Sequence, residues 1–255
     1  TDDPYVSILE GARSGPTAMV SALIHGNEIC GAMALDHLLS SSFAPDRGRL
    51  IVAFANVAAF SRFDPTQPYA SRFIDEDMNR LWSREILDGT RQSVELARAR
   101  ELRPFAEAAN FLLDLHSTSL PAPAMLLCGN RENGRLLAAK MDYPLHVVAD
   151  EGHTSGVRLR DFGDFNNDST TKSSALVECG QHFDGQSPTI ALNTIVAFLF
   201  ACGMLDQASE QFSRPASVTG QRLIEVSHAV TIQCDRFSFS GEFHCFEVIP
   251  KAGTP

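Results

Sequence analysis

The chain of 255 residues has no apolar run long enough to cross a membrane. A membrane-spanning helix needs about 20 mainly apolar residues. The longest run here, Ile190–Met204, contains Asn193 and Thr194 and is typical of a buried helix in a globular protein. The sequence therefore predicts no association with a membrane through a spanning helix.

Positive charge is also scarce. Lysine and arginine number 21 against 31 aspartates and glutamates, which leaves a formal net charge of −10 at pH 7. Nucleic acids and anionic membranes attract basic surfaces, so this balance predicts neither of them as a partner. A site that binds an anion must then be built from a local group of side chains.

Paired cysteines are the third absence. The six cysteines form no Cys-x-x-Cys pair and no spacing typical of a disulfide framework. Several lie in apolar stretches, where buried reduced thiols are usual. We therefore expect a reducing, cytoplasmic compartment. The cysteines are Cys30, Cys128, Cys179, Cys202, Cys234 and Cys245.

Short apolar runs alternate with helical patterns over the first two hundred residues. The runs are almost continuously apolar, as expected of strands covered on both faces. This alternation predicts an α/β fold in which helices sandwich a mixed, mostly parallel sheet. The predicted strands are Val6–Leu9, Ala18–Ile24, Leu50–Asn56, Phe111–His116, Ala124–Cys128, His146–Val148 and Ala175–Cys179. The predicted helices are Glu28–Leu39, Gln92–Ala109, Gly134–Lys140 and Pro188–Cys202.

The pattern changes after about Asp206. Three strand-like segments follow with no helical pattern between them, namely Arg222–Val226, Ala229–Gln233 and Phe246–Ile249. Some fifty residues are too few for an independent core. We therefore expect a catalytic domain over residues 1–205 and, over residues 206–255, the incomplete start of a β-rich C-terminal domain.

A His-x-x-Glu pair stands where an apolar strand runs into a helix. His25 and Glu28 can offer one imidazole nitrogen and one carboxylate to the same metal ion. Catalytic zinc sites use three protein ligands and keep one position open for water. With eight histidines in the chain, such a pair also arises by chance. It needs support from later in the sequence.

A third ligand is available at the end of another strand. His116 follows the apolar run Phe111–Leu115, at the strand edge where open α/β sheets build their sites. On a regular strand Asp114 points to the same face, where its carboxylate can orient the histidine through the second ring nitrogen. The alternative is a loop histidine beside a salt-bridged or helix-capping aspartate.

Glu178 ends the apolar strand Ala175–Cys179 and precedes Gly180. A carboxylate in such a place is costly unless it is paired or catalytic. Beside a metal-activated water it can accept the proton of the water and pass it to a leaving amine. The alternative is a glutamate that emerges into solvent.

A charged loop supplies the fourth group, with Arg72 followed by Asn79 and Arg80. Arginine can form two parallel hydrogen bonds to one carboxylate, and the side-chain amide of asparagine can donate another beside them. Arg72 can instead point at a carbonyl oxygen that becomes negative in the transition state. The alternative is a solvated loop in which the charges pair among themselves, Arg72 with Asp75 and Arg80 with Asp77.

Four motifs along the chain resemble, in their sequence order, those of the succinylglutamate desuccinylase/aspartoacylase family. That family belongs with the zinc carboxypeptidases. The motifs span roughly two thirds of the chain, and the ordered set is far more specific than any one of them. They are His25-Gly-Asn-Glu28, Arg72-x-x-Asp75-x-Asp77-Met-Asn79-Arg80, Asp114-Leu-His116-Ser and Val177-Glu178-x-Gly180.

The resemblance implies a role for each matched residue. His25, Glu28 and His116 would hold one zinc ion per chain, and Glu178 would be the general base and acid. Arg72 would polarise the scissile carbonyl, while Asn79 and Arg80 would hold a substrate carboxylate. The resemblance also implies a mixed α/β sheet followed by a β-rich domain.

One position departs from the pattern. Aspartoacylases resemble one another in having an arginine ten residues before the catalytic glutamate, where it contacts the side-chain carboxylate of the substrate. This chain has Asp168 there. Lys172, Arg158 or Arg160 can substitute for the missing charge, and the sequence does not choose among them.

The sequence thus predicts a zinc-dependent hydrolase acting on a small N-acyl amino acid or a related amide. A carboxypeptidase that uses the same residues on peptides is the nearer alternative. A catalytically silent binding protein on the same scaffold is the more distant one. Two nitrogens and a carboxylate also suit other divalent metals, and both a monomer and a homo-oligomer are compatible with the sequence.

Overall fold

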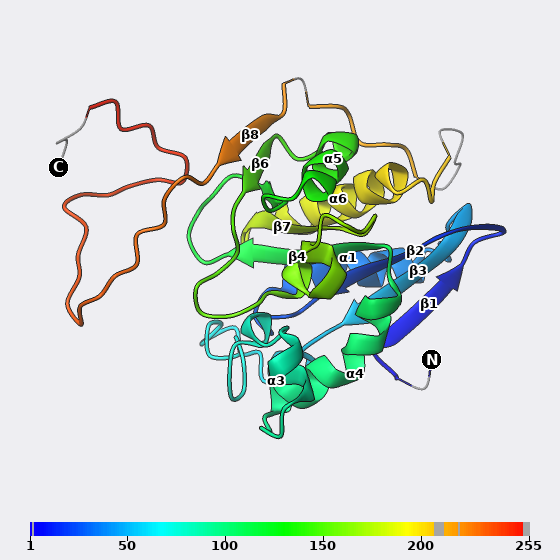
Figure 1. Ribbon diagram of the computed structural model, residues 1–255, viewed down its shortest axis with the longest axis horizontal. Coiled ribbons are helices and arrows are strands. Elements are labelled where there is room, and N and C mark those ends of the chain that lie inside the picture. The colour runs from blue at the N-terminus through cyan, green and yellow to red at the C-terminus, as the bar shows by residue number, and fades with distance from the viewer. Residues whose placement is uncertain (2, 207–211, 219, 252–255) are drawn as a thin grey trace.

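A mixed sheet of eight strands runs through the computed structural model, which describes residues 1, 3–206, 212–218 and 220–251 (Figure 1). Its order is β1-β3-β2-β4-β7-β5-β6-β8, and neighbours are parallel except in the pairs β1–β3 and β5–β7. This confirms the predicted mixed, mostly parallel sheet. The strands are β1 (Val6–Glu10), β2 (Arg13–Ala22), β3 (Arg47–Phe54), β4 (Phe111–Thr118), β5 (Met125–Leu127), β6 (His146–Ala149), β7 (Ser173–Gln181) and β8 (Arg222–Glu225).

Helices cover both faces of the sheet. One apolar core joins it to α1 (Ile29–Ser40), α5 (Glu132–Met141) and α6 (Ser187–Ala201). A second core on the opposite face joins it to α3 (Arg84–Asp88) and α4 (Val94–Ala108), which lie together below the sheet in Figure 1. The predicted sandwich is therefore confirmed. Shorter helices are α2 (Val57–Phe60), η1 (Met78–Arg80), η2 (Leu159–Asp161) and η3 (Gly163–Asn166).

The alternation of side chains along the central strands explains why they read as continuous apolar runs. On β2, Val20 belongs to the core under α1, whereas its neighbour Met19 belongs to the core under α4. On β4, Leu113 belongs to the first of these cores and its neighbour Leu112 to the second. Since successive residues of a strand face opposite sides, a sheet covered twice needs apolar residues at both positions.

Two stretches between the predicted elements, residues 61–81 and 150–172, contain only short 3-10 helices, η1 in the first and η2 and η3 in the second. The prediction missed α2 and α3, which have four and five residues and so show no helical period. Serine side chains begin the helices on this face: Ser83 accepts a hydrogen bond from Ile86 N and Ser93 one from Leu96 N. These are ordinary N-caps.

The expected strands near the C-terminus are only partly correct. Arg222–Val226 is confirmed as β8, which pairs with β6 at the edge of the same sheet. The predicted strands at Ala229–Gln233 and Phe246–Ile249 are wrong. Residues 226–250 contain no helix or strand and extend away from the sheet (Figure 1). Val230 and Val248 are 93% and 83% exposed, and a strand without a paired neighbour is not stabilised. The boundary at residue 206 stays a prediction, since residues 207–211, 219 and 252–255 lie outside the described residues.

Two further features of the described residues bear on the earlier expectations. No helix among them is long and apolar enough to cross a membrane. All six cysteines are free thiols, and Cys30, Cys128, Cys179 and Cys202 are buried.

Candidate active site

Three central parallel strands, β2, β4 and β7, bring the predicted metal ligands and the predicted base to one edge of the sheet. His25 lies three residues beyond the end of β2, and Glu28 caps the start of α1. His116 is on β4, directly opposite Glu178 on β7 in the strand register. The carboxyl ends of neighbouring parallel strands meet at one edge, which is why residues so far apart in sequence converge.

The side chains of His25, Glu28 and His116 form a buried, tightly packed group. His25 Nδ1 lies 2.8 Å from Glu28 Oε1, and His116 Nδ1 lies 2.9 Å from Glu28 Oε2. One ligand atom from each of the three lies within 4.8 Å of the other two. Among the described residues this is the one group of at least three such side chains that can hold a metal ion.

Each histidine is oriented by a second carboxylate through its other ring nitrogen. His25 Nε2 lies 2.9 Å from Asp77 Oδ1, and His116 Nε2 lies 2.8 Å from Asp114 Oδ2. A proton on His116 Nε2 leaves its Nδ1 with a lone pair toward the centre of the group, the usual arrangement around a protein-bound metal. His25 Nε2 also lies 3.0 Å from Arg72 Nη2, a second polar neighbour beside Asp77. Asp114 is where the sequence predicted it, whereas the contact of Asp77 with His25 was not foreseen.

The electrostatics of the group favour a bound cation. Burial raises the pKa of Glu28, but the charges of His25 and His116 outweigh it and leave that pKa well below its usual range. Burial lowers the pKa of His116, but Asp114 and Glu28 outweigh it and leave that pKa well above its usual range. A divalent cation would offset this concentration of carboxylates, so the residues present fit a metal ion.

Glu178 is the one carboxylate of the group that lacks a partner. Its Oε2 is buried without any hydrogen bond. Burial raises the pKa of Glu178 to about 8, and the negative charge of Glu28 acts in the same direction while His116 opposes it. An acid with a pKa near neutrality can both accept and return a proton during a reaction.

Arg72 reaches the group from the loop that precedes η1. Its Nη1 lies 3.2 Å from Glu28 Oε1, and its Nη2 lies 3.5 Å from Asp77 Oδ2. Arg72 does not form the alternative ion pair with Asp75. The carboxylate of Asp75 accepts a hydrogen bond from Val94 N instead. The Arg72 side chain is about one third exposed, so it can meet a ligand.

Asn79 and Arg80 follow on η1, and hydrogen bonds and an ion pair tie them to their surroundings. Asn79 is buried, and its Oδ1 accepts a hydrogen bond from Leu159 N at 2.9 Å. Arg80 Nη1 donates to the carbonyl oxygen of Asn79 at 2.8 Å, and Arg80 Nη2 lies 3.7 Å from Asp77 Oδ2. The pairing of Arg80 with Asp77 is thus present, but long.

A cavity of about 280 Å³ opens onto the group. It is lined by every residue predicted for the site except Asp114, which lies behind His116. Sequence reasoning assigned no role to the small polar residues at the end of β4, of which only Ser117 belongs to a motif, or to two apolar lining residues. The additional lining residues are Ser117, Thr118, Ser119, Leu127, His153, Arg158 and Leu176.

Of the three basic residues that were candidates to replace the missing arginine, one lines the cavity. Arg158 does so, but its guanidinium is engaged by Asp150 at 2.7 Å and by Asp161 at 2.5 Å. Lys172 instead donates to the backbone oxygen of Glu107. Arg160 donates to the backbone oxygen of Cys128, and Asp168 itself pairs with Arg131 at the surface.

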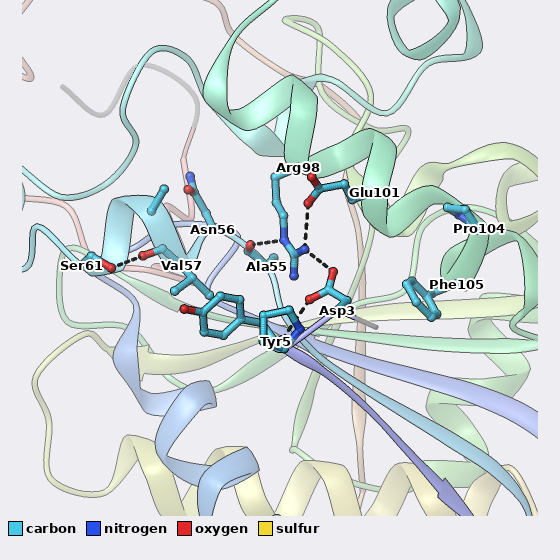
Figure 2. A pocket seen from close by; sticks show the side chains of 12 residues that line it. Asp3, Tyr5, Ala55, Asn56, Val57, Ser61, Arg98, Glu101, Pro104 and Phe105 are labelled. Atoms are coloured by element: carbon cyan, nitrogen blue, oxygen red, sulfur yellow. Dashed lines mark hydrogen bonds and ion pairs between the residues drawn. The ribbon is translucent and has the colours of Figure 1, made fainter. Parts of the chain in front are cut away.

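A larger cavity, of about 870 Å³, lies between the N-terminal residues, α2 and α4 (Figure 2). The guanidinium of Arg98, which lines this cavity, already has several hydrogen-bond acceptors. They are the carbonyl oxygens of Phe54 and Ala55 and the carboxylates of Asp3 and Glu101. None of the three candidate metal ligands lines this cavity. The candidate catalytic residues therefore lie at the smaller cavity.

Comparison with known families places most of this chain in one of them. Residues 14–199 match the family model of the succinylglutamate desuccinylase/aspartoacylase catalytic domain. The solved structure of a succinylglutamate desuccinylase/aspartoacylase from Rhodobacter sphaeroides is similar in fold, with a TM-score of 0.64 and 18% identity over 88% of this chain and 66% of that one.

Two curated relatives are similar in sequence. An N-acyl-aromatic-L-amino acid amidohydrolase of Xenopus laevis is 28% identical over 165 residues, covering 54% of this chain and 49% of the relative. A probable aspartoacylase of Parasynechococcus marenigrum is 32% identical over 124 residues, covering 46% of this chain and 39% of the relative. The chain thus spans about half the length, or less, of these relatives.

Proposed function

The chain belongs to the succinylglutamate desuccinylase/aspartoacylase family, and on this premise we propose that it is a zinc-dependent hydrolase that cleaves the amide bond of a small N-acyl amino acid. The observation that carries the proposal is the group of His25, Glu28 and His116 with the unpartnered oxygen of Glu178 beside it. Two relatives named for related reactions, an amidohydrolase and an aspartoacylase, support it.

His25, Glu28 and His116 are the residues that would hold the metal. Two imidazoles and a carboxylate are a common catalytic zinc set, and the carboxylates behind both histidines would raise their basicity as ligands. When bound, zinc polarises a carbonyl oxygen and lowers the pKa of water to about 7.

Glu178 would be the general base and then the general acid of the reaction. We expect it to accept a proton from the attacking water and later to donate that proton to the departing amine. Its raised pKa of about 8 suits both halves of this task, because a general acid–base group works best near the operating pH. Its unpartnered Oε2 leaves a free acceptor for the proton.

Arg72 would stabilise the charge that develops on the carbonyl oxygen as the water attacks. A charged donor fixed in advance at that position strengthens its hydrogen bond as the charge grows. The hydrogen bond from Gly26 N to the carbonyl oxygen of Arg72, at 3.0 Å, ties its backbone to the loop that carries His25.

Asn79 and Arg80 would hold the carboxylate of the amino acid and so orient the amide bond. Both line the cavity next to Arg72. The cavity volume of about 280 Å³ is at the lower end of ligand sites, which favours a small substrate over an extended peptide.

Metal analysis and a substrate panel test the proposal. We expect about one zinc per chain in the wild type, and none in His116→Ala because one of three ligands is removed. His37→Ala is the matched control, since His37 is an exposed histidine of α1 and should leave the zinc in place. The wild type should release amino acids from N-acyl amino acids, and His116→Ala should not.

Two outcomes would replace the proposal. Faster cleavage of peptides than of any N-acyl amino acid would make the protein a carboxypeptidase. Wild-type protein that binds no metal and cleaves neither panel would be a binding protein on a hydrolase scaffold.

A further inference from the structure

A buried glutamate outside the proposed site, Glu95 on α4, is fully withdrawn from solvent. Its carboxylate accepts four hydrogen bonds: from the side-chain amide of Asn56 at 3.0 Å and from the backbone N–H groups of Ile74, Asp75 and Glu76 at 2.6, 3.1 and 3.3 Å. A buried carboxylate is costly unless it is satisfied in this way. Glu95 is therefore built into the structure as an anchor.

The three backbone donors are consecutive, and they belong to the loop that carries the proposed catalytic arginine. Arg72 lies two residues before them and Asp77 one residue after them. The contact is reciprocal, because Asp75 Oδ2 accepts a hydrogen bond from Val94 N in the first turn of α4 at 2.8 Å. Loop and helix are thus joined by four hydrogen bonds within a few residues.

The same loop is also held tightly against the metal-ligand segment. Gly26 lies so close to it that a Cβ added there would be 2.5 Å from the carbonyl oxygen of Ser71. With Gly26 on one side and Glu95 on the other, the backbone between Ser71 and Glu76 has little freedom to shift. The positions of Arg72 and Asp77 follow from that backbone.

We propose that Glu95 is a positioning residue of the active site, which acts by fixing the loop that presents Arg72 to the scissile carbonyl and Asp77 to His25. This inference rests on the proposed function. Arg72 Nη1 lies 3.2 Å from Glu28 Oε1, and Asp77 Oδ1 lies 2.9 Å from His25 Nε2. Errors of about 1 Å in such contacts can cost about 100-fold in rate.

Glu95→Gln is the test variant, because it keeps the size of the side chain and replaces one of the two accepting oxygens with an NH2 group. That group donates and so cannot pair with the loop N–H groups. We expect kcat to fall about 10- to 100-fold, with one zinc per chain retained. Glu101→Gln, an exposed position on the same helix, is the control and should keep the wild-type kcat.

Two readouts separate positioning from a general loss of stability. Combined with Arg72→Ala, Glu95→Gln should cost much less than it does alone, because residues that act through one another are not additive. Hydrogen exchange of the peptide covering residues 72–80 should accelerate in Glu95→Gln and remain unchanged in Glu101→Gln. Should Glu95→Gln not fold, Asp75→Ala removes the reciprocal hydrogen bond and should show the same two effects in weaker form.

Full additivity with Arg72→Ala, or unchanged kcat and unchanged exchange in a folded and zinc-loaded Glu95→Gln, would overturn the inference. A wild-type protein without hydrolytic activity would be a failure of the proposed function instead. The exchange experiment still decides in that case, since anchoring of the loop by Glu95 predicts faster exchange whether or not a substrate is turned over.

Discussion

The two cavities both bring an arginine and carboxylates together, yet they use them in opposite ways. In the larger one, Arg98 is surrounded by the carbonyl oxygens of Phe54 and Ala55 and the carboxylates of Asp3 and Glu101, all but Phe54 drawn in Figure 2. Around the two histidines at the smaller one lie Glu28 and Glu178, with Asp77 and Asp114 behind the rings, and an oxygen of Glu178 has no partner. One arrangement is complete within the protein and the other is not.

This difference teaches that cavity size is a poor indicator of chemistry here. A satisfied ion pair stabilises the fold and offers little to a ligand, since its donors and acceptors are already used. A buried acid without a partner costs stability and persists in a folded chain when it has another use. The incomplete group is the better candidate for function, although its cavity is about a third as large.

Glu178→Gln gives the sharpest test of this comparison. The amide keeps the shape of the side chain but cannot accept and return a proton, so we expect kcat to fall about 100- to 10,000-fold. Zinc content should be unchanged because Glu178 is not one of the proposed ligands. Steady-state kinetics beside elemental analysis measure both quantities, and a variant with near wild-type kcat would remove Glu178 as the base.

Arg98→Met tests the other cavity and should give the reverse pattern. The change removes the donor that Arg98 supplies to the carbonyl oxygens of Phe54 and Ala55 and to one oxygen of the Asp3 carboxylate. We expect the free energy of unfolding to fall by about 1–3 kcal/mol, with kcat unchanged in the folded protein. Urea unfolding and the hydrolase assay on the same sample would check this, and a selective loss of kcat would show that the larger cavity belongs to the site.

A further test is the pH dependence of stability in the metal-free protein. Because the pKa of Glu178 is raised from 4.5 to about 8, its contribution to stability is fully present below pH 4.5 and is lost as the pH rises towards 8. Relative to Glu178→Gln, the wild type should therefore lose at most about 1.4 kcal/mol per pH unit across this range. Urea unfolding of both proteins at several pH values measures the difference, and parallel curves would contradict the raised pKa.

Local signals were enough to find most of the site. His25 and Glu28 stand at a strand-to-helix junction and His116 at the end of an apolar strand, so strand ends made a common site possible, and the resemblance of the ordered motifs to one family selected these three residues. Asp114 was predicted from its two-residue spacing to His116, and the contact is present. These predictions succeeded because each depends on a short segment and on the rule that parallel strands end at one edge.

Other contacts left no local signal. Nothing in the segment around Asp77 indicates that it meets His25, 52 residues away, and nothing around Glu95 indicates that it receives three N–H groups of the arginine loop. The segments Ala229–Gln233 and Phe246–Ile249 show the converse error. Their residues suit strands, but a strand also needs a neighbour to pair with, and residues 226–250 pair with none.

By itself the sequence determined the class of fold, the order of the longer helices and strands up to α6 and the three side chains of the candidate metal site, because periodicity and motif spacing are local properties of a chain. Only the tertiary structure decided which carboxylate orients His25, which residue anchors the arginine loop and which of three basic residues reaches the cavity. Those outcomes depend on how distant segments pack, and packing distances of a few ångströms are not encoded in the spacing of residues along one segment.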